Sequence, residues 1–138
     1  MSALRLWFSF VLLAMLGLIG WASSRCALFD IPREVLTHPW FIATLLDAYF
    51  AFIAFWVWVA WKEGTIAARV LWLTTLLLWG NPAVAGYMLL ELARVKRDQG
   101  GLDAVFTVRR PGRARLPAIL TLLGIAVYAL GAKSFLFA

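Results

Sequence analysis

Residues 37–63, THPWFIATLLDAYFAFIAFWVWVAWKE, decide the fold of this chain. The 23 residues between His38 and Lys62 are all apolar or aromatic except Thr44 and Asp47. A helix needs about 20 such residues to cross a hydrocarbon core roughly 30 Å thick, so this stretch predicts a membrane span. Pro39 in the first turn and Trp40 at headgroup depth are typical of the entry to a span.

The composition of the whole chain agrees with a membrane protein. Of its 138 residues, 64% are hydrophobic, 14% are charged and eight are tryptophan. A soluble domain of this size could not keep so much apolar surface away from water, which indicates one integral membrane domain over residues 1–138. The single Cys26 excludes an internal disulfide and a cysteine-rich metal site, and we predict no metal site. The formal charge of +6 favours membrane orientation over nucleic-acid binding.

Hydropathy divides the chain into four predicted spans and one sizeable connection. The spans cover residues 4–22, 39–61, 67–93 and 116–135, and a basic loop covers residues 94–115. We therefore expect an all-α fold: an integral membrane four-helix bundle with short loops and both termini on the same side. The first span could be mistaken for a signal peptide, but Arg25 directly before Cys26 spoils a lipoprotein-type site and we expect the segment to be retained.

Asp47 is the most informative residue of the second span. It lies about nine residues in, roughly 13 Å deep at about 1.5 Å per residue, where a charge is costly and usually functional or paired. Ala43, Ala51 and Ala54 share its helical face, and small residues let helices approach closely. We therefore expect Asp47 to point into the bundle. The opposite face should meet lipid or a partner subunit; it carries Phe41, Leu45, Tyr49, Phe52 and Trp56.

The third span contains Gly80-Asn81-Pro82 at its centre. Pro82 cannot donate a backbone hydrogen bond, so we expect a kink within a continuous helix. Asn81 should lie at the depth of Asp47, which makes a direct or water-mediated hydrogen bond between them a reasonable expectation. Glu91 near the end of the span should meet Arg94.

Basic residues set the expected orientation. With four crossings, nine basic residues fall on the side of the first and third loops and four on the side of the termini. The positive-inside rule then places loops one and three in the cytoplasm and both termini outside, in a bacterial inner membrane. Four arginines of the third loop are expected to contact lipid headgroups: Arg109, Arg110, Arg113 and Arg115.

Three pieces of the sequence resemble a known family. Residues 37–47 (THPWFIATLLD), the exit at residues 58–63 and the segment 103–110 are similar to the domain-of-unknown-function family numbered 1475, small multi-pass proteins of plants and bacteria. The similarity covers roughly residues 29–110. It implies a membrane protein, draws attention to Pro39, Trp40, Asp47, Lys62 and Glu63, and implies no activity.

Each candidate site residue has a functional and a structural interpretation. Asp47 could exchange a proton or bind a cation, or it could make a packing hydrogen bond. The break at Asn81 could present a carbonyl to a ligand, as in transporters, or could only shape the bundle. The tryptophans could cradle a lipid, quinone, carotenoid or chlorophyll-type pigment, or could form interfacial belts. The candidate ligand- or proton-binding residues are Asp47, Asn81, Thr44, Tyr49, Tyr87, His38 and Trp40.

Three functions are compatible with these features. The first is a non-enzymatic accessory subunit that packs against a larger membrane complex, a second copy of itself or a lipid-like cofactor. The second is a homodimeric proton-coupled carrier that uses Asp47. The third is an intramembrane isomerase or cyclase that uses Asp47 with Tyr49, Asn81 or Tyr87. No catalytic residue is predicted, because no nucleophile, phosphate loop or metal-ligand spacing is recognisable.

Overall fold

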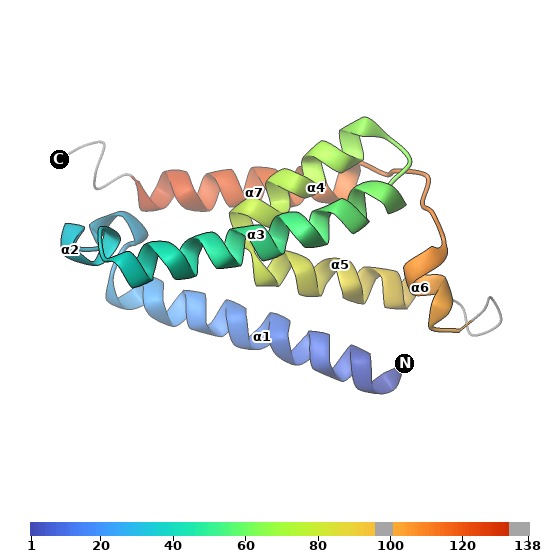
Figure 1. Cartoon of the computed structure of the whole chain (residues 1–138), viewed down its shortest axis with the longest axis horizontal. Coiled ribbons are helices and arrows are strands. Elements are labelled where there is room, and N and C mark those ends of the chain that lie inside the picture. The colour runs from blue at the N-terminus through green and yellow to red at the C-terminus, as the bar shows by residue number, and fades with distance from the viewer. Residues whose placement is uncertain (96–100, 133–138) are drawn as a thin grey trace.

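The computed structural model describes residues 1–95 and 101–132, and over these ranges the chain is all-α, as predicted (Figure 1). Two helices, α1 and α3, are long and apolar enough to cross a membrane by length and composition, and the rest of the chain buries almost none of either. In chain order the elements are α1 (Ser2–Arg25), the 3-10 turn η1 (Leu28–Asp30), α2 (Arg33–Leu36), α3 (Pro39–Lys62), α4 (Ile66–Trp79), α5 (Asn81–Arg94), α6 (Asp103–Thr107) and α7 (Arg115–Gly131).

The third predicted span, residues 67–93, is wrong as a single crossing helix. It is divided into α4 and α5, and α5 runs back beside α4 instead of continuing it (Figure 1). Trp72 of α4 packs edge-on against Tyr87 of α5, with ring centroids 4.8 Å apart. Each arm has 14 residues. At about 1.5 Å per residue an arm is roughly 21 Å long, which is shorter than a hydrocarbon core of about 30 Å.

The α4–α5 hairpin turns at Gly80. Its backbone has φ 58° and ψ −127°, a conformation that side-chain-bearing residues rarely adopt. A Cβ atom there would also lie 2.9 Å from the ring of Phe52. Pro82 sits in the first turn of α5, where a helix needs no N–H donor. The expected kink at Pro82 is therefore wrong, because Gly80 has already reversed the chain.

Two tyrosines cap the end of α4 inside the fold. Tyr49 of α3 donates to the carbonyl of Leu77 over 3.4 Å, and Tyr128 of α7 donates to the carbonyl of Leu78 over 3.1 Å. The last carbonyls of a helix have no intrahelical partner, and an apolar environment offers them no water. The tyrosines thus allow a helix to end in the middle of the molecule.

The hairpin also fixes which segments meet at each end of the molecule. At one end, here called the α6 end, Arg5 Nη2 of α1 donates to the carbonyl of Leu92 over 2.8 Å, and the backbone of Arg110 pairs with that of Lys62. At the other, the η1 end, the end of α1 and η1 approach the end of α7, where Phe29 packs on Tyr128 with ring centroids 6.4 Å apart.

The hairpin places the start of α1 and the end of α7 at opposite ends of the described fold. The start of α1 lies at the α6 end, whereas α7 ends at Gly131 near η1 (Figure 1). Loop one, residues 23–38, lies at the η1 end and so opposite to α6. The predictions that both termini share one side of a membrane, and that loops one and three share the other, stay predictions. Parts of two predicted segments, 96–100 and 133–135, lie outside the described residues.

The faces of α3 differ from the predicted ones, although Leu45, expected on the outer face, is exposed as predicted. Tyr49 and Phe52 point to the hairpin, and Trp56 Nε1 donates to the carbonyl of Arg69 over 2.8 Å. Asp47 and its small neighbours are exposed instead. The physical reason is that the hairpin offers backbone carbonyls to aromatic donors, which the alanine face could not satisfy.

Candidate functional site

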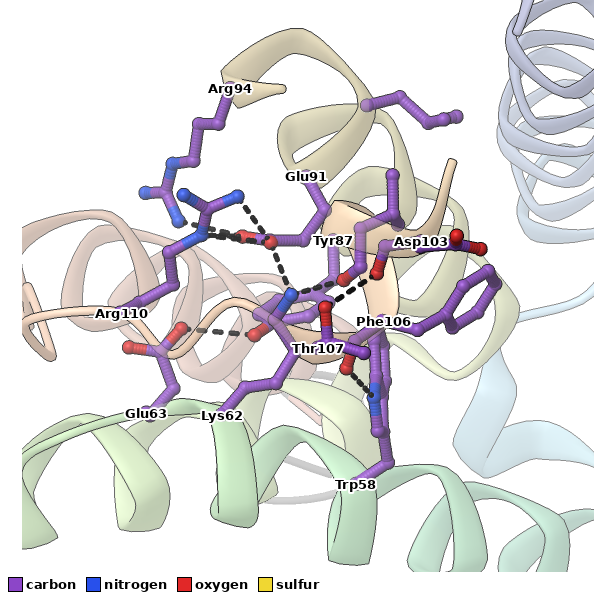
Figure 2. A network of polar contacts seen from close by, with 12 residues as sticks. Trp58, Lys62, Glu63, Tyr87, Glu91, Arg94, Asp103, Phe106, Thr107 and Arg110 are labelled. Atoms are coloured by element: carbon purple, nitrogen blue, oxygen red, sulfur yellow. Dashed lines mark hydrogen bonds and ion pairs between the residues drawn. The ribbon is translucent and has the colours of Figure 1, made fainter. Parts of the chain in front are cut away.

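A buried ion cluster joins α3, α5 and the chain after α6 (Figure 2). Its centre is Glu91, whose carboxylate is fully buried and receives three cations. Arg94 Nη1 donates over 3.0 Å, and Arg110 Nε donates to both carboxylate oxygens over 3.1 and 2.9 Å. Arg110 Nη2 lies 2.8 Å from Oε2 as an ion pair without a hydrogen bond of its own.

Lys62 supplies the third cation and ties the cluster to α6. Its Nζ lies 2.7 Å from Glu91 Oε2, and neither side chain is exposed. The same nitrogen donates to the carbonyl of Val105 and lies 5.1 Å from the centre of the Trp58 ring. Since a buried ammonium is stable only when paired and hydrogen-bonded, these contacts explain how Lys62 can end a long apolar helix without reaching water.

Glu63 and Tyr87 form the second polar pair of the cluster. Tyr87 donates to Glu63 Oε1 over 3.0 Å, from a ring that packs edge-on against Phe55, Trp58 and Trp72. Burial raises the pKa of Glu63 above its ordinary value of 4.5, and the hydrogen bond from Tyr87 opposes part of this rise. The carboxyl group thus has an apolar wall on one side and cations on the other.

The groups of the ion cluster are directed at one another. Three cations pair with the carboxylate of Glu91, and the phenol of Tyr87 donates to Glu63. None of these ionisable side chains lines the apolar cavity at the η1 end. A buried network of this kind rigidifies the segments that carry it and fixes their register.

An apolar cavity of about 530 Å³ lies at the η1 end. The tip of the hairpin, Leu78 and Trp79, forms its floor, while α1, η1 and α7 form its walls. The cavity exists because the hairpin stops partway, so that nothing fills the space between α1 and α7 beyond it. Trp79 Nε1 can donate to the carbonyl of Leu120 on α7 because Gly124 has no side chain: a Cβ atom there would be 2.8 Å from Trp79 Nε1.

The lining of the cavity is mostly hydrocarbon. Ile19 and Ala22 of α1, Leu28 and Phe29 of η1 and Val127 of α7 contribute apolar surface. Polar atoms are few: Ser23 and Cys26 lie at the end of α1, and the hydroxyl of Tyr128 is already bound to the carbonyl of Leu78. The volume falls in the range of roughly 300–1,000 Å³ that is typical of small-molecule sites.

A family model described as "Protein of unknown function (DUF1475)" matches residues 4–108 of the chain. The chain belongs to the DUF1475 family. The match begins in α1, earlier than the resemblance at residues 29–110 indicated, and it includes every residue of the ion cluster except Arg110. No curated protein and no solved structure matches this DUF1475 chain.

The predicted site residues do not gather in one place. Tyr87 is in the ion cluster and Tyr49 caps α4. His38 precedes α3 and is exposed, as are Trp40 and Thr44, whose hydroxyl binds the carbonyl of Trp40 in the previous turn.

Asp47 and Asn81 are also exposed, and the hydrogen bonds found among the described residues include none between them. The expectations that Asp47 points into the bundle and bonds directly to Asn81 are therefore wrong, and the water-mediated alternative stays a prediction. Asn81 stands at the tip of the hairpin, where the chain turns, and not within a straight helix at the depth of Asp47.

The arginines expected at lipid headgroups divide into two groups. Arg110 is half-buried on Glu91, so its predicted headgroup contact is wrong in this fold. Arg109, Arg113 and Arg115 are exposed, and Arg109 Nε donates to the carbonyl of Trp61 over 3.1 Å. The predicted pair of Glu91 with Arg94 is confirmed.

Sequence analysis of this DUF1475 chain did not predict that Arg110 binds Glu91, or that Glu91 is the centre of the ion cluster. The available signal was an acidic residue four positions after Tyr87, on the same helical face and near the end of an apolar helix. Such a carboxylate needs several donors if it is buried, and the nearby basic loop could supply them. No feature of the sequence indicated that α5 returns to the end of α3.

Proposed function

We propose that this chain is a small, non-enzymatic integral membrane protein that holds an apolar, lipid-like molecule in the cavity at the η1 end. The single observation that carries the proposal is the cavity of about 530 Å³, walled by α1, η1 and α7 and floored by the hairpin tip. Its hydrocarbon lining suits an acyl chain or an isoprenoid tail better than a polar substrate.

Membrane insertion is supported by the exposure of the two long helices. Buried residues make up 0% and 6% of the most apolar windows of α1 and α3. A soluble protein rarely leaves contiguous apolar surface of this extent in water. In our proposal α1, α3 and α7 cross the bilayer, and α4–α5 is a re-entrant hairpin. The 17 residues of α7 are at the lower limit of about 17–25 residues for a span.

Basic side chains support an orientation that differs from the sequence-based one. Among the described residues, eight basic side chains belong to segments at the α6 end and two to segments at the η1 end. The positive-inside rule then places the start of α1 and α6 in the cytoplasm, and loop one outside, in a bacterial inner membrane. The eight are Arg5, Lys62, Arg69, Arg94, Arg109, Arg110, Arg113 and Arg115; the two are Arg25 and Arg33.

The other candidate functions receive less support. A carrier or an isomerase built on Asp47 needs a cavity that reaches its carboxyl group, and Asp47 does not line the cavity at the η1 end. An accessory role beside a larger complex is compatible with the lipid-binding proposal, because the outer faces of α1 and α3 remain free for contacts within the described fold.

Photolabelling tests the proposed function. Membranes that contain the protein would be treated with palmitic acid bearing a diazirine, and labelled peptides would be mapped by mass spectrometry. We expect labels in the second half of α1 and in α7. Ala22→Phe, which fills the cavity, should lower this labelling severalfold, whereas Ala14→Phe on the exposed surface of the same helix should not.

Equal labelling of the two variants would contradict a specific site and indicate contact with bulk lipid only. A second measurement, native mass spectrometry after purification in mild detergent, should find a co-purifying lipid-like molecule in the parent and Ala14→Phe proteins. Its retention by Ala22→Phe would also count against the proposal.

A further inference from the structure

A separate apolar groove lies at the α6 end of the fold, opposite to the cavity at the η1 end. It is bounded by α1 and α3, which both pack on α5, and by α6 (Figure 1). Its volume is about 430 Å³, and every described residue that lines it is apolar or aromatic. Leu4 and Phe8, one turn apart on α1, face Val84 and Met88, one turn apart on α5. The groove therefore runs along the helices, which is the direction of acyl chains in a bilayer.

The size of the groove favours an acyl chain over another helix. An α-helix with its side chains is about 10–12 Å across and rises about 5.4 Å per turn, so two turns occupy roughly 850–1,200 Å³. The groove offers less than half of that volume. Its one indole donor is already engaged, since Trp58 Nε1 donates to the carbonyl of Phe106 over 3.3 Å. The groove thus suits a thin hydrocarbon occupant that brings no polar group into it.

A cation stands at the end of the groove. Arg5 follows Leu4 on α1, and its Nη2 donates to the carbonyl of Leu92, one turn beyond Met88 on α5. A guanidinium has five N–H donors, and this is the side-chain hydrogen bond that Arg5 makes among the described residues. No carboxylate of the described part of the chain pairs with it, and it is exposed. The bond to Leu92 therefore holds a cation with spare donors beside the mouth of an apolar groove.

We infer that the groove binds one acyl chain of an anionic phospholipid, whose phosphate is held by Arg5. The inference rests on the proposed membrane insertion, and the proposed orientation places this site in the inner leaflet. A guanidinium matches the geometry of a phosphate through paired, charge-assisted hydrogen bonds. Basic pockets between membrane helices on the cytoplasmic side bind anionic headgroups in the same way. A zwitterionic lipid brings its own cation close to the phosphate, so it should bind more weakly.

Native mass spectrometry of the full chain in mild detergent tests the headgroup contact. Chain-deuterated phosphatidylglycerol and phosphatidylcholine with the same chains would be titrated separately, so that added lipid differs in mass from any co-purified molecule. We expect the first phosphatidylglycerol to bind about tenfold more tightly than phosphatidylcholine. Arg5→Gln should remove this preference, and Arg5→Lys should keep most of it. Glycerol 3-phosphate, a headgroup without chains, should not bind at the same concentrations.

Arg113→Gln is the matched control, because it removes the same charge from an exposed residue that does not line the groove. It should keep the preference for phosphatidylglycerol. Equal affinities of the two lipids for the parent protein, or an equal loss of preference in Arg113→Gln and Arg5→Gln, would overturn the contact of the phosphate with Arg5. Binding of glycerol 3-phosphate as tight as that of the lipid would show a site for soluble phosphates and overturn the lipid.

Val84→Phe tests the chain-binding part of the site. The added ring fills the groove, so both lipids should bind severalfold more weakly. Val57→Phe makes the same substitution on a surface of α3 outside the groove, where the side chain is 60% exposed, and should change neither affinity. Unchanged lipid binding in Val84→Phe would show that the groove does not hold the chain. A dimer that Val84→Phe dissociates would show that a second copy fills the groove, and would also overturn the inference.

Ala22→Phe keeps this site distinct from the cavity of the proposed function. It fills the cavity at the η1 end and should bind added phosphatidylglycerol as the parent protein does. If the preference for phosphatidylglycerol is absent but palmitate still labels α1 and α7, the groove inference fails and the proposed function is untouched. The converse result removes the proposed function alone. If a carbonate wash removes the chain from membranes, insertion itself fails, and both proposals fail with it.

Discussion

At the scale of single residues, the fold depends on how one buried carboxylate is neutralised. Glu91 is paired with Arg94 one turn further along α5 and with two cations that are distant in the sequence, Lys62 and Arg110. Removing one member of a buried charged network leaves the others uncompensated, which costs far more than the net gain from forming it. The three cations differ in burial, so we expect the loss of a more buried cation to lower the free energy of unfolding by more.

Glu91→Gln should lower the free energy of unfolding by about 3–5 kcal/mol, because three cations lose their shared carboxylate. Arg94→Gln is the matched control: the Arg94 side chain is 31% exposed, and its loss should cost less than about 1 kcal/mol. Thermal unfolding in mild detergent measures both. Similar losses for the two variants would show that Glu91 is not the centre of the cluster.

Glu63 should make the free energy of unfolding fall as the pH rises, whereas a salt-bridged carboxylate makes it rise. Below its ordinary pKa of 4.5, Glu63 is neutral in both the folded and the unfolded chain and carries no penalty. As the pH rises from 4.5 through the raised pKa of the folded state, ionisation favours the unfolded chain and stability falls. Glu63→Gln removes this loss and still accepts the hydrogen bond from Tyr87.

The measurement is the difference in free energy of unfolding between Glu63→Gln and the parent protein at pH 4 and at pH 8. We expect the variant to gain relative stability as the pH rises. A difference that is constant over this range would mean that burial does not disfavour the charged form of Glu63.

At the residue level, sequence analysis predicted an ion pair between residues close in the sequence but not one between residues far apart in it. The Glu91–Arg94 pair follows from helical spacing and is confirmed. The contact of Glu91 with Arg110 joins residues 19 apart across a change of direction, so no helical repeat predicts it. Asp47 shows a different error: its small neighbours predicted a face directed into the bundle, but this face is exposed.

At the scale of elements, the α4–α5 hairpin is the feature that sequence analysis missed. Hydropathy alone cannot distinguish a kinked span from two short antiparallel arms, since both are one long apolar run. The useful signal was the order of residues in Gly80-Asn81-Pro82. Glycine favours the position after a helix and proline the first turn of the next, so this order is typical of one helix ending and another beginning.

Gly80→Ala tests the turn directly. The positive φ of Gly80 and the ring of Phe52 at 2.9 Å both oppose a side chain, so we expect a loss of about 2–3 kcal/mol in the free energy of unfolding. Gly86→Ala is the control, since Gly86 is helical and a Cβ atom there meets nothing within 4 Å. Helix propensity makes that substitution neutral or stabilising. A harmless Gly80→Ala would contradict the turn.

Tyr128→Phe tests how the hairpin ends. It removes only the hydroxyl that caps the carbonyl of Leu78, so the expected loss is about 1–2 kcal/mol, measured as above. Tyr49→Phe, whose bond to Leu77 is longer at 3.4 Å, should cost less. If Tyr49→Phe proved the more damaging of the two, the capping role of Tyr128 would be wrong.

At the scale of the whole molecule, the fold makes the single native cysteine a reporter of orientation. Cys26 is exposed at the η1 end, which the proposed orientation places outside the cell. A membrane-impermeant maleimide added to intact cells should therefore label Cys26. Arg109→Cys in a Cys26→Ser background should be labelled only after permeabilisation. The reverse pattern would invert the proposed orientation and restore the predicted cytoplasmic location of loop one.

The two halves of the molecule differ in cross-section because the hairpin stops midway. Near α6 the hairpin arms α4 and α5 pack among α1, α3 and α7, whereas near η1 both arms have ended (Figure 1). In a bilayer such a wedge displaces more lipid from one leaflet than from the other. The protein should consequently accumulate where the membrane bends toward the narrow end. Since the hairpin turns at Gly80, the backbone conformation of this one glycine would determine the preferred membrane curvature.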